Sequence, residues 1–222
     1  PHLLAAWLDA GRLIERLLLT QQGLANPEIA ALTERTAAPQ SLLDDQLFAE
    51  LSELPSQSGV LAIVGIPQAR LPRRDGFCLL LDGVQDPGNV GAVLRTAVAA
   101  GVEQALLSPG CADVWSPKTL RAGMGAQAVL DIVERADLPA FARAFNGRIA
   151  ATLLDGATDL YRTDLTGDLA LILGAEGAGV SPELASLAGV RLKIPMAAGI
   201  ESLNVGAAAA ICLYERVRQV YY

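Results

Sequence analysis

The chain has 222 residues, of which 52% are hydrophobic and 18% charged, and its formal net charge is −7. This composition is typical of a folded protein with a sizeable core and excludes a disordered chain. The acidic balance argues mildly against a nucleic-acid partner, and apolar runs such as 60–64 are far shorter than the roughly 20 residues that cross a membrane.

The first 68 residues are typical of a small α/β unit. Hydrophobic periodicity predicts helices over 3–19, 26–37 and 41–51, followed by a strand over 58–65. Asn26 is a plausible N-cap, with Pro27 at the first helical position. Because a helical pattern is already under way at the start of the chain, we expect this unit to lack its N-terminal beginning. Residues 69–75 have the composition of a linker.

Residues 76–222 alternate between strands and helices. The expected strands cover 77–82, 104–108, 148–154, 169–174 and 190–194, and the clearest helices cover 89–100 and about 203–219. Apolar strands separated by helices predict a largely parallel sheet that is covered on both faces. Ligands of such sheets bind beyond the carboxyl ends of the strands, so the loops after these strands are the candidate site.

The histidine and cysteine content excludes several kinds of active site. His2 is the single histidine in the sequence, which argues against a Ser-His-Asp triad, a Cys-His pair or a histidine metal site. Cys78, Cys111 and Cys212 are odd in number and lack C-x-x-C spacing, so neither a disulfide framework nor a zinc site is indicated. We expect a cytoplasmic protein that needs no metal.

Two polar loops follow the predicted strands 77–82 and 169–174. In "LDGVQDPGNVGAVLRTAVAAG", Asn89 can cap the following helix and Arg95 can be a surface arginine, but both can also serve a site. In "LILGAEGAGVSPEL", Gly174 permits close approach of the backbone to a ligand, and Glu176 lies between glycines. Ser181 with Pro182 reads as an ordinary helix start.

A third polar loop precedes the last helix, in "IPMAAGIESLNVGAAAAICLYE". Ser202 can cap that helix, which leaves Glu201 and Asn204 without a structural reason. Elsewhere, five basic residues could form a local basic face: Arg73, Arg74, Arg95, Lys118 and Arg121.

The three loops together resemble the signature motifs of the SpoU branch of the SPOUT RNA ribose methyltransferases. The matching segments are "DPGNVGAVLRTAVAAG", "LILGAEGAGVS" and "IPMAAGIESLNVGAAAAICLYE", supported by "SPKTLRAGMGA" at 116–126, and the resemblance covers roughly 76–218. It implies an α/β methyltransferase domain over 76–222 with a C-terminal trefoil knot, paired as a homodimer. Residues 1–68 are similar in position and pattern to the small α/β RNA-binding domain of many members.

The resemblance also implies the cofactor and the site residues. S-adenosylmethionine would be held mainly by backbone groups, at Gly174, Ile194 and Leu203, with Met196 and Thr152 as further candidates. Asn89, Arg95, Glu176, Ser202 and Asn204 match the polar catalytic set. Arg95 is often cast as the base, but because a guanidinium is normally protonated, positioning the hydroxyl or a phosphate is the easier role.

Several alternatives remain open at this point. Ribosomal RNA is the favoured substrate, and transfer RNA is the alternative. A non-catalytic RNA-binding protein on the same scaffold is a further possibility. A Rossmann-type methyltransferase fits poorly, because the acidic residue expected after the second strand is absent where that strand ends at Ser108.

Overall fold

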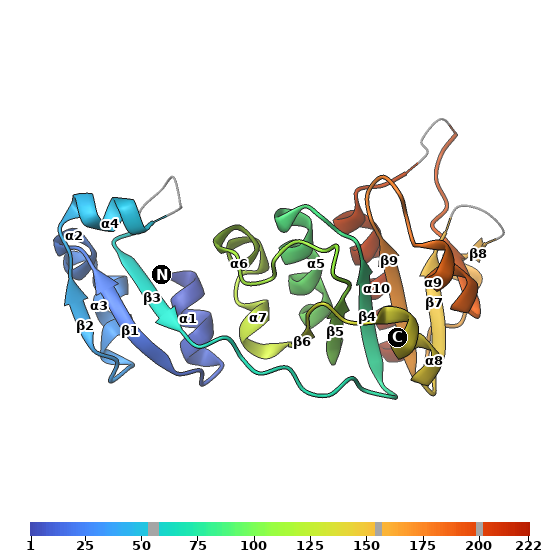
Figure 1. The fold of residues 1–222 in the computed structure, drawn as a ribbon, viewed down its shortest axis with the longest axis horizontal. Coiled ribbons are helices and arrows are strands. Elements are labelled where there is room, and N and C mark those ends of the chain that lie inside the picture. Colours follow the sequence, from blue (N-terminus) through green and yellow to red (C-terminus); the bar gives the residue numbers. More distant parts are fainter. Residues whose placement is uncertain (53–57, 154–156, 199–201) are drawn as a thin grey trace. The chain divides into compact units, whose positions relative to one another are not determined.

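The computed structural model describes residues 1–52, 58–153, 157–198 and 202–222 (Figure 1). The chain divides into two compact units, Pro1–Gln68 and Ala69–Tyr222. Among the described residues, no helix is both long and apolar enough to cross a bilayer.

The first unit is an α/β unit, as its pattern predicts, but its sheet has three strands where the pattern predicts one. The strands β1 (Ile14–Leu19), β2 (Gln40–Leu42) and β3 (Val60–Val64) take the order β2-β1-β3, with β2 parallel and β3 antiparallel to β1. The helices are α1 (His2–Asp9), α2 (Gln21–Ala25), α3 (Pro27–Glu34) and α4 (Asp45–Leu51). Asn26 caps α3 as expected, since its side-chain oxygen accepts from the Glu28 N–H at 2.9 Å.

Two helix predictions in this unit are wrong in part. The predicted helix 3–19 ends at Asp9, Gly11 takes a positive φ of 66°, and Ile14–Leu19 forms the central strand β1. Pairing with strands on both sides decides the conformation here, because local helical periodicity carries no information about partners distant in sequence. The predicted helix 41–51 begins only at Asp45, since residues 40–42 pair with β1.

The second unit holds a seven-stranded sheet in which every adjacent pair is parallel, as predicted. Its strands are β4 (Phe77–Asp82), β5 (Gln104–Leu107), β6 (Asp131–Val133), β7 (Arg148–Thr152), β8 (Thr158–Asp159), β9 (Leu169–Gly174) and β10 (Val190–Lys193). The spatial order is β6-β5-β4-β9-β7-β10-β8. Counted within the unit this is 3-2-1-6-4-7-5, which differs from the Rossmann order 3-2-1-4-5-6 and rules that alternative out.

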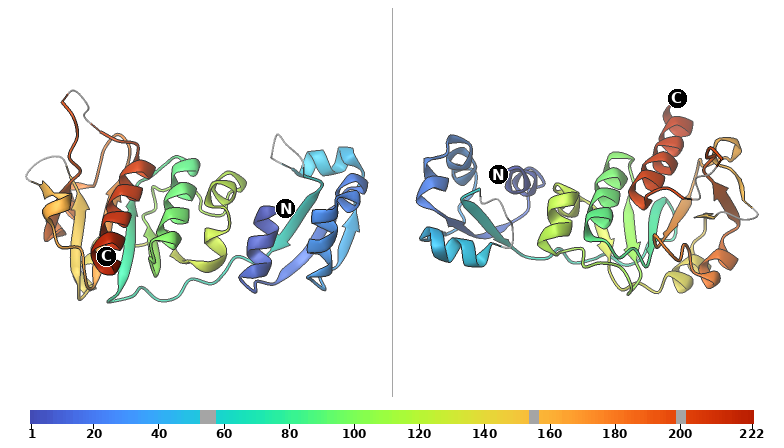
Figure 2. Two further views of the ribbon diagram at one scale, coloured as in Figure 1. Left: turned by 180° about the vertical axis from the view of Figure 1, so that it is seen from behind. Right: turned by 90° about the horizontal axis from the view of Figure 1, so that it is seen from above.

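Helices cover both faces of this sheet (Figure 2). The helices are α5 (Pro87–Ala99), α6 (Pro117–Gly123), α7 (Ala126–Val129), α8 (Leu138–Ala144), α9 (Pro182–Leu187) and α10 (Val205–Tyr221), with a short 3-10 helix η1 at Leu160–Arg162. One core cluster joins the sheet to α5 and α10, and a second joins its other face to α8 and α9. Successive side chains of a strand point to opposite faces of the sheet, so strands such as β4 and β9 contribute residues to both clusters. The trefoil knot stays a prediction.

The segment predicted as a linker, residues 69–75, is hydrogen-bonded to the sheet of the second unit. Gln104, which is fully buried, accepts from the Arg73 N–H at 2.8 Å and donates to the Leu71 carbonyl at 3.2 Å. It also donates to Asp131 at 2.6 Å, and Asp131 accepts from the Arg70 N–H at 3.0 Å. Residues 70–73 therefore form a strap across the amino ends of β5 and β6.

We expect Gln104→Ala to release this strap. The change leaves the Arg73 N–H and the Leu71 carbonyl without their partner, which should cost about 1–3 kcal/mol of unfolding free energy. Trypsin should then cleave after Arg70, Arg73 and Arg74 faster than in the wild type, as followed by mass spectrometry. The matched control is Gln85→Ala at an exposed position. Equal cleavage of the two variants would contradict the role given to Gln104.

The five basic residues do not form one face. Arg73 pairs with Glu103 at 2.6 Å, at the amino ends of β4 and β5, whereas Lys118 lies 3.6 Å from Asp86, beyond the carboxyl end of β4. The two ends of a strand are separated by its length, so the expectation of a single basic face is wrong.

Candidate functional site

The three polar loops meet at the carboxyl edge of the parallel sheet. The first follows β4 and leads into α5, the second follows β9, and the third follows β10 and leads into α10. Strands β4 and β9 are neighbours, with Asp82 opposite Gly174, so the first two loops leave the sheet side by side. This placement agrees with the general position of ligand sites in open α/β sheets.

Hydrogen bonds join one side chain from each loop. The Asn89 side-chain amide donates to Glu176 Oε1 at 2.8 Å, and the Asn204 amide donates to Asn89 Oδ1 at 3.0 Å. Residues that are 87 and 115 positions apart in sequence thus form a connected cluster. The bonds fix which way each amide points, because each nitrogen must face an acceptor. We call Asn89, Glu176 and Asn204 the polar cluster.

Two helix caps hold the polar cluster in place, and neither is the one expected. Asn204 caps α10, with Oδ1 accepting from the Gly206 and Ala207 N–H groups at 2.9 and 3.3 Å. Asp86 caps α5 by accepting from the Asn89 N–H at 2.8 Å. The suggestions that Ser202 caps the last helix and that Asn89 caps α5 are therefore wrong.

Asp86 is the residue that the sequence reasoning missed. An aspartate directly before a proline at the first helical position is a recognisable helix start, so Asp86-Pro87 could have been identified. The Asn89 N–H, helped by the Lys118 ammonium, lowers the pKa of the Asp86 carboxyl. Asp86 is therefore an anion at neutral pH and orients the start of α5 beneath Asn89.

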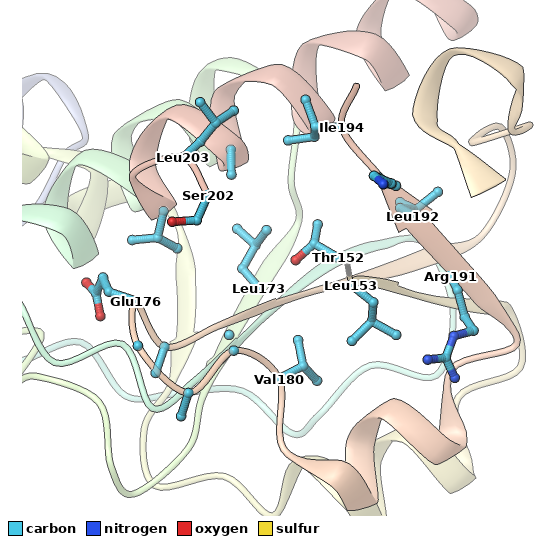
Figure 3. Close-up of a pocket in the computed structure, with 18 of the residues that line it drawn as sticks. Thr152, Leu153, Leu173, Glu176, Val180, Arg191, Leu192, Ile194, Ser202 and Leu203 are labelled. Atoms are coloured by element: carbon cyan, nitrogen blue, oxygen red, sulfur yellow. The ribbon is translucent and has the colours of Figure 1, made fainter. Parts of the chain in front are cut away.

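A cavity of about 500 Å³ opens beside the polar cluster (Figure 3). All five residues predicted to bind the cofactor line it, namely Thr152, Gly174, Ile194, Met196 and Leu203. Glu176 and Ser202 also line it, and in Figure 3 they lie toward one end while Arg191 lies at the other. Glu201, which the sequence also singled out, lies outside the described residues.

The wall of the cavity suits a ligand that is held by backbone groups. A tight loop runs from Ala175 to Gly179, whose backbones exchange hydrogen bonds of 3.1 and 2.9 Å. A Cβ on Gly174 would lie 2.0 Å from the Gly179 carbonyl carbon, so only glycine permits this packing. Leu173, Val180 and Leu192 add apolar wall. The volume lies within the range of about 300–1,000 Å³ typical of cofactor sites. The residues present therefore fit S-adenosylmethionine, with apolar surface for the base and glycine-rich backbone that a ligand can approach closely.

Arg95 stands apart from the polar cluster. It is exposed on α5, six residues after Asn89, which places the two side chains about 120° apart around the helix axis. Among the described residues, its side chain makes no hydrogen bond or ion pair. The structure thus brings together Asn89, Glu176 and Asn204 and places Ser202 on the cavity wall, whereas Arg95 lies outside this cluster.

The thiols are poorly suited to chemistry. Burial raises the pKa of Cys78 and of Cys212 to about 12, and it also raises the pKa of Cys111. Thiolates are the reactive form, so these cysteines are inert at neutral pH. In the described part of the chain, no group of three or more His, Cys, Asp or Glu side chains is arranged for a metal ion.

Comparison with known proteins places this geometry in a family. Residues 76–214 match the model of the SpoU rRNA Methylase family. The chain is 32% identical over 216 residues to the 23S rRNA (guanosine(2553)-2′-O)-methyltransferase RlmP of Bacillus subtilis, covering 91% of this chain and 86% of that protein.

Solved structures agree with this match. The SpoU methyltransferase AviRb of Streptomyces viridochromogenes, in complex with AdoMet, superposes with a TM-score of 0.84 at 28% identity, covering 98% of this chain and 87% of that one. A structure concerned with 2-OH methylation of C/U34 on tRNA has a TM-score of 0.58 at 32% identity, covering 65% of this chain and 95% of that one. The chain belongs to the SpoU rRNA methylase family.

Proposed function

We propose that this protein transfers the methyl group of S-adenosylmethionine to a ribose 2′-hydroxyl of ribosomal RNA. The observation that carries the proposal is the polar cluster at the mouth of a cavity fit for the cofactor. Its members come from three separate motifs, and the RlmP relative is named for this reaction.

Alignment supplies most of the catalysis in this proposal. The bound cofactor supplies a methyl group already activated on a sulfonium. The chain must therefore orient the ribose oxygen toward the cavity, and holding reactants in line removes much of the barrier. Asn89 keeps one amide N–H beyond its bond to Glu176, and Asn204 keeps one beyond its bond to Asn89. These N–H groups and the Ser202 hydroxyl orient the ribose.

The 2′-hydroxyl must also lose its proton. Glu176 is a carboxylate on the cavity wall, exposed and bound on one oxygen by Asn89. Its other oxygen accepts the hydroxyl proton in our proposal. Arg95 contacts the RNA and holds a phosphate or the hydroxyl, which its guanidinium can do while protonated.

We favour ribosomal RNA over transfer RNA as the substrate, because the rRNA-modifying relative matches a larger share of this chain than the tRNA-related structure does. The rRNA relative matches 91% of this chain, whereas the tRNA-related structure spans 65%. We assign unit Pro1–Gln68 to recognition of the RNA. Its basic side chains apart from His2 are three arginines, of which Arg35 pairs with Asp9 and Arg16 donates to Ser41. Recognition by this unit then depends on shape more than on charge.

The test compares total RNA from a strain lacking the gene with RNA from its parent. Mapping of 2′-O-methyl groups should show one ribosomal site lost and restored by the purified enzyme. Loss of a tRNA site instead would favour the alternative substrate. Calorimetry with S-adenosylhomocysteine should show one binding site, and the absence of such a site would favour a non-catalytic RNA-binding protein.

Asn204 gives a test of the polar cluster. Asn204→Ala removes both the α10 cap, at a cost of about 0.5–2 kcal/mol of stability, and the bond to Asn89. Asn204→Ser keeps a capping oxygen but is too short to reach Asn89. We expect both variants to lose methyl transfer about tenfold, while only the alanine variant melts earlier. Activity that follows the folded fraction alone would make Asn204 purely structural.

We further propose that the enzyme is a cytoplasmic homodimer. Tyr214 and Tyr221 are exposed on α10 with fractional exposures of 50% and 71%, and their spacing of seven residues places both on one side of the helix, where they offer apolar surface to a second copy. Light scattering at micromolar concentration should give twice the chain mass. A monomer would contradict the dimer and leave the methyltransferase assignment in place.

A further inference from the structure

A second cavity opens at the same edge of the sheet. It has a volume of about 370 Å³ and lies beyond the ends of β4 and β5, where Asp82 and Ser108 line it. Arg135 and Asp137, which follow β6, line another side, and Ala136 and Leu184 add apolar wall. No step of the proposed mechanism uses this cavity.

The two cavities are immediate neighbours. Asp82 lines the second and pairs in the sheet with Gly174, which lines the first. Val180 lines the first and Ser181 the second, and the Ser181 N–H donates to Asp82 Oδ2 at 2.8 Å. The ends of β4 and β9 and this hydrogen bond therefore separate the two cavities, so a substrate held at the first cavity lies close to the second.

Arg135 supplies the positive charge of this cavity, and its backbone has a positive φ angle. Its φ of 51° is a left-handed conformation that side chains other than glycine and asparagine rarely adopt. The residue is exposed, and its side chain makes no hydrogen bond or ion pair with the part of the chain that the structure describes. With none of the described residues engaging it, the guanidinium can bind an anion.

The second cavity carries charges of both signs, because two carboxylates, Asp82 and Asp137, line it together with Arg135. Asp82 accepts from Ser181 and Asp137 accepts from the Ala140 N–H at 2.9 Å, each through one oxygen. Within the described residues, the other oxygen of each carboxylate is unpaired. A small free anion is disfavoured beside two carboxylates and one arginine. A nucleotide fits better, because its linkage is anionic while the amino groups of its base donate to carboxylate oxygens.

We infer that the second cavity binds one unstacked nucleotide of the RNA, next to the nucleotide that is methylated. Arg135 pairs with its phosphate, the apolar wall takes the base, and Asp82 and Asp137 face its amino groups. Sequence-specific recognition of RNA commonly uses such splayed single-stranded bases. The inference rests on the proposed function, since the ligand is the substrate of that reaction.

The test measures binding of a substrate oligonucleotide to the protein saturated with S-adenosylhomocysteine. Arg135→Asn removes the charge but tolerates the left-handed backbone. Arg143→Asn is the control, because it removes one exposed arginine from α8, one that pairs with Glu183 at 2.7 Å. We expect Arg135→Asn to weaken RNA binding five- to tenfold and to reduce the slope of log affinity against log salt by about 0.7–0.9, the value for one lost phosphate contact. The control should leave the slope unchanged.

Replacing single phosphates of the oligonucleotide by neutral methylphosphonates identifies the phosphate that Arg135 contacts. At one linkage beside the methylated nucleotide, neutralisation should weaken wild-type binding but have no further effect on Arg135→Asn, which is the non-additivity expected of two groups in contact. Additive effects at every linkage, or equal slopes for both variants, would overturn the assignment of the cavity. A wild-type protein that transfers no methyl group to ribosomal RNA would overturn the proposed function as well, so the two failures are distinguishable.

Discussion

Replacing Arg95 by alanine is expected to lower the single-turnover rate of methyl transfer by a factor of about one hundred or more, the scale of loss when reacting groups are no longer held in line. The fold should be unaffected, because Arg95 is exposed and pairs with none of the described residues, and such side chains contribute less than about 0.5 kcal/mol to stability. Affinity for S-adenosylhomocysteine should also be unchanged, since Arg95 is not on the wall of the cofactor cavity.

Arg95→Lys separates two roles of the side chain. Lysine keeps the charge but lacks the planar pair of donors that binds a phosphate or a hydroxyl in a fixed orientation. Bidentate positioning predicts that the lysine variant fails like alanine, whereas simple charge attraction predicts partial activity. The control is Arg143→Ala, an exposed arginine on α8 at the other face of the sheet. Near-wild-type transfer by Arg95→Ala would contradict the mechanism proposed here, even though the family assignment would stand.

Gly174→Ala is expected to damage both folding and cofactor binding. The new Cβ would lie 2.0 Å from Gly179 C and 2.2 Å from Val180 N, and both are backbone atoms that no rotamer change can move. Overpacking of this kind costs about 1–3 kcal/mol, and more where backbone must shift. The loop from Ala175 to Gly179 would have to move away from the end of β9, which changes the wall of the cavity.

Thermal melts and calorimetry with S-adenosylhomocysteine check this expectation. Affinity for S-adenosylhomocysteine should fall by at least about tenfold, the equivalent of 1.4 kcal/mol. Gly189→Ala is the matched control, because a Cβ there meets nothing within 4 Å and the residue lies outside the cavity. If the two variants melted at the same temperature and bound the ligand equally, the packing role given to Gly174 would be wrong.

The sequence by itself determined the class of the second unit and the identity of its motifs. Five predicted strands matched β4, β5, β7, β9 and β10 because buried parallel strands are continuous apolar runs bounded by glycine and polar residues. The short elements β6, α6, α7 and α8 were not predicted, since few residues in each carry a periodic signal. In the first unit, the segment 14–19 has helical periodicity and is nevertheless a strand, because its partners β2 and β3 lie far along the chain.

Only the tertiary structure decided how the candidate residues act together. Sequence motifs indicated Asn89, Glu176 and Asn204, but the order of hydrogen bonds among them depends on side chains brought together from three loops. The same holds for the caps: Asp86 and Asn204 were chosen over Asn89 and Ser202 by where each helix could begin against the sheet. Local sequence specifies which residues can cap, bind or pair. Packing across the sheet fixes which of them do so, because each hydrogen bond requires a partner whose position is set by elements remote in sequence.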